Sequence, residues 1–145
     1  MYQILLVEDN ADDVELTLRA FRKSDLVNTV TVARDGVEAL DYLYRRNQYA
    51  GRPASHPLII LLDLKMPRVD GLEVLRQIKH DAGLRFIPIV MLTSSREEQD
   101  IVESYNLGAN AYVVKPVAFE AFVGVVKQIG LFWILINEPP ARHSM

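Results

Sequence analysis

The chain has 145 residues, half of them apolar, with a formal net charge of −3 and no cysteine. This length predicts one domain spanning residues 1–145, and the lack of cysteine excludes disulfides, thiolate metal sites and Cys nucleophiles and favours a cytoplasmic location. The charge balance argues against nucleic-acid binding, and no basic leader or bilayer-length apolar run indicates secretion or membrane insertion.

Short apolar segments alternate with amphipathic segments along the whole chain. The segments that we predict as strands are residues 3–7, 29–33, 58–62, 87–92 and 111–114. We predict five helices. They run from the Asn10 cap to about residue 24, over 37–46, from after Gly71 to about 80, from the Ser95 cap to about 107, and over 118–136. Residues 47–57 contain Gly and Pro without periodicity and predict a surface loop of unusual length.

Five such alternations predict an α/β fold with a doubly wound, five-stranded parallel sheet and five helices. In the strand order 2-1-3-4-5, a crevice opens between strands 1 and 3 at the carboxyl edge of the sheet. Ligands of open α/β sheets bind in such a crevice.

The residues that end the predicted strands are acidic, hydroxyl-bearing or basic: Glu8, Asp9, Asp63, Thr93 and Lys115. Taken alone, Asp63 has loop capping as a fair rival explanation. Two carboxylates about 5 Å apart repel by roughly 3 kcal/mol at an effective dielectric near 20, so the three acids together need counter-charge. Lys115 supplies one positive charge, and an open site made of oxygen ligands suits Mg²⁺.

A metal held by carboxylates, with a Lys and a Thr facing the same point, suits a phosphoryl group, and Asp63 would be the nucleophile. Asp12 and Asp13 fall in the first turn of a helix, where the helix dipole explains them. The three histidines are interpreted as surface residues: His56, His80 and His143.

Four motifs, in their order and in their spacing along the chain, resemble those of response-regulator receiver domains of two-component systems. They are Leu-Leu-Val-Glu-Asp at 5–9, Leu-Leu-Asp-Leu-Lys-Met-Pro at 61–67 with Asp-Gly at 70–71, Met-Leu-Thr-Ser at 91–94, and Gly-Ala-Asn-Ala-Tyr-Val-Val-Lys-Pro at 108–116. The resemblance implies that a histidine kinase phosphorylates Asp63. It also implies Mg²⁺ bound by Asp9, Asp63 and the backbone carbonyl of Lys65, with Glu8 acting through water.

The resemblance further assigns switch roles near the carboxyl edge. Lys115 would pair with Asp63 or with its phosphate, and the bond from Lys115 to Pro116 would be cis. Thr93 would move toward the phosphate, and Tyr112 would turn inward with it. The alternative is that Tyr112 is an ordinary aromatic residue of the strand without a switch role.

Three features resemble, more narrowly, the single-domain regulators paired with cyanobacterial and bacterial phytochromes. They are the 47–57 loop, the sequence Leu-Leu-Asp-Leu-Lys-Met-Pro at residues 61–67, and the C-terminal segment from Phe132-Trp133 to Pro139-Pro140. We therefore expect a phytochrome kinase as partner. Because only a short tail, residues 137–145, follows the last helix, we expect no output domain and action through partner binding or phosphorelay.

The last predicted helix is apolar nearly all round, so its second side needs cover. We expect this side, with strand 5 and the helix before it, to form a homodimer or a kinase-docking surface. The alternative is that the long loop or the tail folds over it.

Two enzyme or cofactor functions compete with the signalling function. A small Mg²⁺-dependent phosphohydrolase would use an aspartyl nucleophile, but many of these enzymes carry an acid-base Asp at the position that Lys65 occupies. A flavin-binding protein of the flavodoxin type needs a phosphate-binding loop after strand 1, where acidic residues 8–12 would repel phosphate. We expect no catalysis beyond phosphorylation and dephosphorylation of Asp63 itself.

Overall fold

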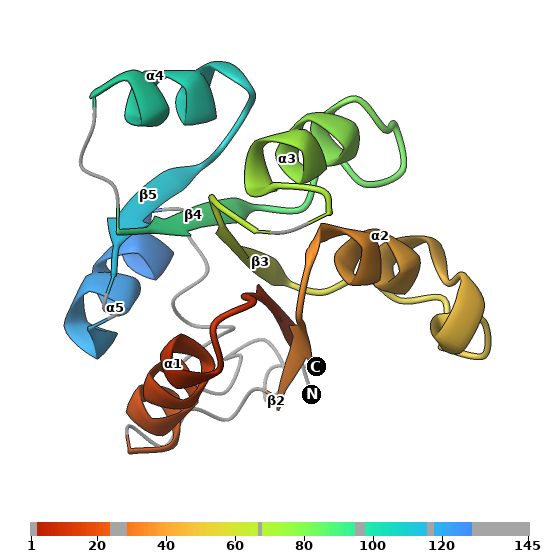
Figure 1. Cartoon of the computed structure of the whole chain (residues 1–145), viewed down its shortest axis with the longest axis horizontal. Helices are drawn as coiled ribbons and strands as arrows, with labels where there is room; N and C mark the ends of the chain where they lie inside the picture. Colours follow the sequence, from red (N-terminus) through yellow and green to blue (C-terminus); the bar gives the residue numbers. More distant parts are fainter. Residues whose placement is uncertain (1–2, 24–28, 67, 95–97, 116–117, 129–145) are drawn as a thin grey trace, which may run out of the picture.

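The computed structural model describes residues 3–23, 29–66, 68–94, 98–115 and 118–128 (Figure 1). Its strands are β1 (Gln3–Val7), β2 (Thr29–Ala33), β3 (Ile59–Asp63), β4 (Ile89–Thr93) and β5 (Ala111–Val114). Its helices are α1 (Ala11–Lys23), α2 (Gly36–Tyr44), the 3-10 turn η1 (Asn47–Tyr49), α3 (Gly71–Lys79), α4 (Glu98–Asn106) and α5 (Phe119–Gln128). The strands are all parallel in the order β2-β1-β3-β4-β5, which confirms the predicted fold.

The sheet lies between two layers of helices. Figure 1 shows α1 and α5 on one side of it and α2, α3 and α4 on the other. All five residues of β3 are buried, as its unbroken apolar run predicts for a central strand covered on both faces. This burial holds Asp63, at the end of the strand, inside the protein at the carboxyl edge of the sheet.

Helix α2 differs from the predicted 37–46 at both ends. Asp35 caps it, because its side chain accepts a hydrogen bond of 2.8 Å from the Glu38 backbone N–H, so the helix begins at Gly36. A Cβ on Gly36 would lie 2.1 Å from the Val69 carbonyl oxygen, which explains the glycine. The helix ends where Arg45 takes a left-handed conformation with φ of 55°.

Strand β4 begins at Ile89 and includes Thr93, whereas residues 87–92 were the expected strand. Pro88 has no N–H to donate and lies outside the strand, although its carbonyl accepts a 3.0 Å hydrogen bond from Ile60. Within the predicted 47–57 loop, the structure adds the short turn η1.

Some expectations concern residues outside the described part of the chain. These are the Ser95 cap, the Pro116 peptide bond, the helix beyond Gln128 and the tail at 137–145. Within the described residues, α5 buries Phe122 and Val126 against the α1 side of the sheet.

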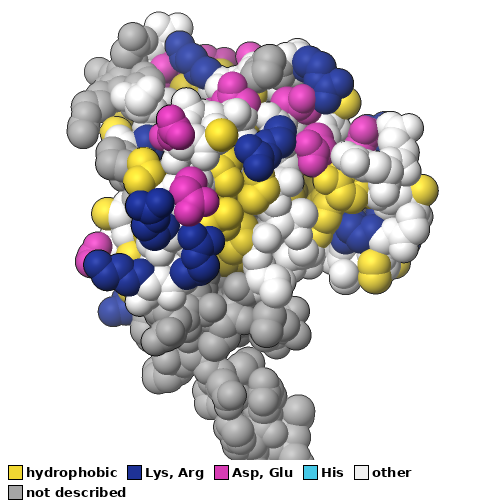
Figure 2. Space-filling model, turned by 60° about the horizontal axis from the view of Figure 1, so that its bottom comes forward, with side chains coloured by type: hydrophobic (Ala, Val, Ile, Leu, Met, Phe, Trp, Pro, Cys, Tyr) yellow, Lys and Arg dark blue, Asp and Glu magenta, His cyan; other side chains and the backbone are white. Residues whose placement is uncertain are grey.

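The surface carries hydrophobic side chains as well as charges. Figure 2 shows one face, on which hydrophobic side chains gather centrally and Lys, Arg, Asp and Glu side chains flank them. None of the helices in the described residues combines the length and the hydropathy that crossing a membrane requires.

Candidate functional site

Strand register places two carboxylates side by side at the carboxyl edge of the sheet. Val7 of β1 pairs with Leu62 of β3, so the next residues, Glu8 and Asp63, are neighbours. The Glu8 backbone is held by a 2.9 Å hydrogen bond from its N–H to the Ala33 carbonyl on the other flanking strand. Glu8 is 1% exposed and Asp63 4% exposed, so both acids are withdrawn from water.

A third carboxylate, Asp9, completes an acidic group that fits a hard cation. Glu8, Asp9 and Asp63 each offer an oxygen, and these oxygens lie within 4.8 Å of one another. Asp9 is exposed and keeps the group open to solvent, which suits a cation that retains several waters. The donor set therefore fits Mg²⁺. The side chain of Lys65 is exposed, and the role expected for its backbone carbonyl stays a prediction.

Lys115 brings a cation to these acids from β5. Its backbone N–H donates to the Thr93 carbonyl at 2.8 Å, which fixes the residue just beyond the last strand. Its Nζ lies 2.9 Å from Glu8 Oε1, 2.9 Å from Asp13 Oδ2 and 3.4 Å from Asp63 Oδ1. One ammonium thus contacts three carboxylates, and its side chain is largely buried among them.

The electrostatics of the site follow from burial and crowding. Burial, and then the hydrogen bond and charge of Glu8, raise the pKa of Asp63 to about 8, although Lys115 opposes the shift. Burial alone would lower the pKa of Lys115, but hydrogen bonds to Asp13 and Glu8 and the charge of Asp63 raise it above its ordinary value. The ammonium is therefore permanent, whereas Asp63 is poised to bind either a proton or a cation.

The two expected switch residues lie on adjacent strands. Leu92 pairs with Asp63, so Thr93 ends β4 at the same edge as the acids, and it is 3% exposed. Tyr112 pairs with Met91 further back in the sheet and is half-buried against the core on the α2 and α3 side. The structure thus brings Thr93 to the site, and it places Tyr112 in the strand that leads to Lys115.

Sequence reasoning missed Asp13 as a site residue and explained it by the helix dipole alone. Asp13 is indeed in the first turn of α1, and its N–H donates to the Asn10 side chain at 2.9 Å, which confirms the expected cap. Its carboxylate nevertheless accepts from Lys115, 102 residues away. The available signal was its position in the first turn of the helix that starts directly after the acidic end of β1.

The loop after Asp63 is fixed by two contacts that the sequence did not indicate. A Cβ on Gly71 would lie 2.0 Å from the Asp63 carbonyl oxygen, so only glycine fits there. Arg68, in a left-handed conformation with φ of 65°, donates from Nε and Nη2 to Asp35 Oδ2 at 2.9 Å and 2.6 Å. The Arg68–Asp35 pair tethers the β3–α3 loop to the start of α2, and the close approach at Gly71 holds the start of α3 against Asp63.

The two described histidines do not belong to this acidic group. His56 and His80 are exposed, as expected, and His143 lies outside the described residues.

The model of the response regulator receiver domain matches residues 4–127. This chain therefore belongs to the response regulator receiver domain family. As a receiver domain it shares its fold with the bacteriophytochrome response regulator AtBRR, at a TM-score of 0.87 and 59% identity over 95% of this chain and 99% of that one. The family assignment does not favour the phosphohydrolase alternative.

Two cyanobacterial receiver structures are also similar. The Mn²⁺-bound form of response regulator Rcp1 is 37% identical, with a TM-score of 0.76 over 92% of this chain and 94% of that one; Rcp1 comes from Synechocystis. The phosphorylated cyanobacterial phytochrome response regulator RcpA is 43% identical, with a TM-score of 0.76 over the same shares. The receiver fold and the likeness to phytochrome-associated regulators are both confirmed.

Proposed function

We propose that this receiver domain accepts a phosphoryl group on Asp63 from a phytochrome histidine kinase and acts through partner binding or phosphorelay. The single observation that carries the proposal is the position of Lys115 Nζ, within 3.4 Å of Asp63 and in contact with two further acids. A loop cap at Asp63 would need neither this cation nor the oxygen donors beside it.

In the proposed step, an Asp63 carboxylate oxygen attacks the phosphorus of a phosphohistidine. The new O–P bond forms as the P–N bond breaks, and the leaving imidazole nitrogen keeps the electron pair and takes a proton. The Lys115 ammonium, which lies 3.4 Å from Asp63 Oδ1, donates to a phosphoryl oxygen, and the Thr93 hydroxyl donates to another. The inward turn of Tyr112 follows the movement of Thr93 and transmits the change to β5.

Mg²⁺ is the proposed cofactor. Asp9, Asp63 and the Lys65 carbonyl would hold it directly and Glu8 through water, and when bound it neutralises charge on the phosphoryl oxygens. The cluster of three carboxylate oxygens supports this proposal, and so does the Mn²⁺-bound form of Rcp1.

The proposed kinase partner rests on relatives whose names refer to phytochromes. The proposed homodimer uses the surface of α4, β5 and α5. Val102 and Tyr105 support it, because these apolar side chains of α4 are 49% and 48% exposed beside β5. We further propose a cytoplasmic protein without nucleic-acid or membrane partners.

We propose that the activity of the chain is limited to the phosphorylation and dephosphorylation of Asp63 itself. Many phosphohydrolases of the alternative class carry an acid-base Asp two residues after the nucleophile, and Lys65 occupies that position here, which argues against this alternative.

The experiment that tests the function is incubation with Mg²⁺ and acetyl phosphate, followed by intact mass measurement. We expect one acid-stable, base-labile phosphoryl group on the wild-type chain and on Asp70→Asn, and none on Asp63→Asn. Asp70 is a matched control because it is exposed and caps α3, accepting from the Glu73 N–H at 3.0 Å. Labelling of Asp63→Asn to the same extent would overturn the proposal.

The partners are tested separately. A purified phytochrome kinase should transfer its phosphoryl group to the chain in a light-dependent amount, and transfer from unrelated kinases alone would contradict the pairing. Solution mass at micromolar concentration should show a dimer that Tyr105→Lys disrupts and that Leu16→Lys, an equally exposed apolar position on α1, leaves intact. A monomer with and without phosphate would contradict the dimer.

A further inference from the structure

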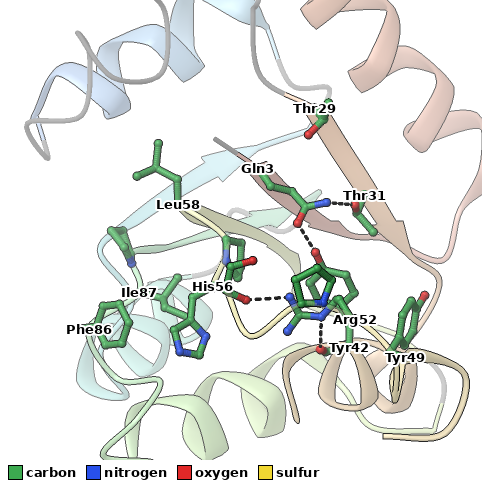
Figure 3. A pocket seen from close by; sticks show the side chains of 14 residues that line it. Gln3, Thr29, Thr31, Tyr42, Tyr49, Arg52, His56, Leu58, Phe86 and Ile87 are labelled. Atoms are coloured by element: carbon green, nitrogen blue, oxygen red, sulfur yellow. Dashed lines mark hydrogen bonds between the residues drawn. The ribbon is translucent and has the colours of Figure 1, made fainter. Parts of the chain in front are cut away.

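A cavity of about 980 Å³ lies at the edge of the sheet opposite to Asp63. Gln3 and Thr29, which begin β1 and β2, line it, together with Leu58 and Pro88, which directly precede β3 and β4. Its outer wall is the later part of the 47–57 loop, from Arg52 onward (Figure 3). The unusual length of this loop, which the phosphorylation site does not use, thus serves to enclose a cavity.

The wall of the cavity is rich in rings. Tyr42 and Tyr49 meet edge to face with centroids 5.1 Å apart, and His56 and Phe86 do the same at 5.4 Å. Phe86 is 64% exposed, a high value for so large an apolar side chain. These residues present flat apolar surfaces that a ring or a short apolar chain would cover.

Arg52 is held rigidly in this cavity. Its Nε donates to the Tyr42 carbonyl at 2.9 Å, its Nη1 donates to the Ser55 carbonyl at 2.7 Å, and its guanidinium carbon lies 4.1 Å from the centroid of the Tyr42 ring (Figure 3). Its Nη2 makes no hydrogen bond or ion pair with any residue that the structure describes. The group is therefore oriented in advance, with donors to spare, and ordering it would cost a ligand little entropy.

The charge of the cavity is one-sided. The lining drawn from the described residues contains Arg52 and His56 and no Asp or Glu. Three polar side chains beside it are already paired, since the Tyr42 hydroxyl donates to Gln3 and the Gln3 amide donates to Thr31 (Figure 3). Nη2 of Arg52 is thus a cationic donor with spare hydrogen-bonding capacity, which calls for an anionic acceptor.

We propose that this cavity binds a small molecule with an aromatic or similarly apolar body and an anionic head, such as a carboxylate or a sulfonate. The head accepts from Nη2 of Arg52, and the body lies against Phe86 and the neighbouring rings. The cavity volume falls within the range of small-molecule sites, about 300–1,000 Å³. Because the cavity lies at the opposite edge of the sheet, the proposal does not rest on phosphorylation of Asp63.

Two fluorescent probes of nearly equal shape test this proposal. One is 1-anilinonaphthalene-8-sulfonate, which is anionic, and the other is N-phenyl-1-naphthylamine, which is neutral. We expect saturable binding of both, with amide NMR shifts concentrated in residues 52–58 and 86–88. Arg52→Gln should weaken sulfonate binding about tenfold and change binding of the neutral probe by less than about twofold, as loss of one charge-assisted hydrogen bond predicts.

Two further variants keep the result interpretable. Phe86→Ala, at an exposed position, should weaken both probes by a similar factor, and Arg19→Gln on α1 should affect neither. Unchanged acetyl phosphate labelling would show that each variant is folded and would keep this test apart from the function of Asp63. The proposal is overturned if Arg52→Gln weakens both probes equally or neither, or if the shifted amides lie outside these segments.

Discussion

Lys115 Nζ lies 2.9 Å from Asp13 Oδ2, and this contact joins the end of β5 to the first turn of α1. The same nitrogen contacts Glu8 and Asp63, so the ammonium holds together three carboxylates from two segments that flank the crevice. Removing any one acid changes how the cation is shared among the rest. Asp13 thereby controls how much of Lys115 is available to Asp63.

Asp13→Ala should cost more stability than Asp12→Ala. Both acids lie in the first turn of α1, so each variant loses a similar interaction with the helix dipole, and the difference between them reports the contact with Lys115. We expect the free energy of unfolding to fall by about 1 kcal/mol more in Asp13→Ala, because the contact is a charge-assisted hydrogen bond that is partly exposed. Urea unfolding measures it, and equal losses would contradict the role of the contact.

In metal-free buffer, Asp63 should make stability depend on pH. Burial and Glu8 raise its pKa to about 8 in the folded chain, against about 3.9 in an unfolded one. The folded state therefore holds the proton more tightly, so this contribution is complete below about pH 4 and is lost as the pH rises through about 8.

Asp63→Asn cannot ionise and should escape this loss. We expect its advantage in melting temperature over the unmodified chain to grow between about pH 5 and pH 9 in the presence of a chelator. Added Mg²⁺ should shrink the advantage at high pH, because the cation stabilises the ionised carboxylate. A difference that stays constant across this range would show that the pKa of Asp63 is not raised.

Arg68 should hold down the pKa of Asp35. Burial alone would raise that pKa, but the Glu38 N–H and Arg68 together bring it below its usual value. Arg68→Gln should therefore raise the pKa of Asp35, as measured by NMR titration of its carboxyl carbon, whereas Arg85→Gln should leave it unchanged. An unaltered pKa in Arg68→Gln would mean that the β3–α3 loop is not tethered through this pair.

Gly71→Ala should damage the site, because the new Cβ would meet the Asp63 carbonyl at 2.0 Å. We expect a loss in the free energy of unfolding of about 1–3 kcal/mol, typical of overpacking, together with slower labelling by acetyl phosphate. In Gly51→Ala the new Cβ meets nothing within 4 Å in the described part of the chain, so this variant should stay within about 0.5 kcal/mol of the wild-type chain. Similar stabilities of the two variants would contradict the close approach.

Gly124→Ala should act in the opposite direction. Gly124 lies inside α5, and among the described residues its Cβ would also meet nothing within 4 Å. Alanine should stabilise the helix by up to about 1 kcal/mol, because it has a higher helix propensity. A loss of stability in thermal unfolding would show that another group occupies this position.

The fold was predictable because each apolar run has one physical solution. A run such as residues 58–62 is too short for a helix and too apolar for an exposed strand, so it belongs in a parallel sheet. The polar residue that ends each run then falls at one edge, which is why Glu8, Asp9, Asp63, Thr93 and Lys115 could be placed together from sequence alone.

The contacts that the sequence did not reveal join residues far apart in the chain. Lys115 and Asp13 are 102 residues apart, and Arg68 and Asp35 are 33 apart. Local interactions explain each of these acids in another way: Asp13 by the helix dipole of α1 and Asp35 by its capping of α2. Only the register of the strands and the path of the loops decide which of these groups meet, and the same is true of the cavity around Arg52.

The position of the phosphoryl group decides whether Asp63 is the phosphoacceptor. Borohydride reduces an aspartyl phosphate to homoserine, so peptide sequencing after labelling with acetyl phosphate locates the modified residue. Homoserine should appear at Asp63 and depend on Mg²⁺. Homoserine at position 9, or the reduced form of glutamate at position 8, with Asp63 unmodified, would contradict the assignment of Asp63 as the phosphoacceptor.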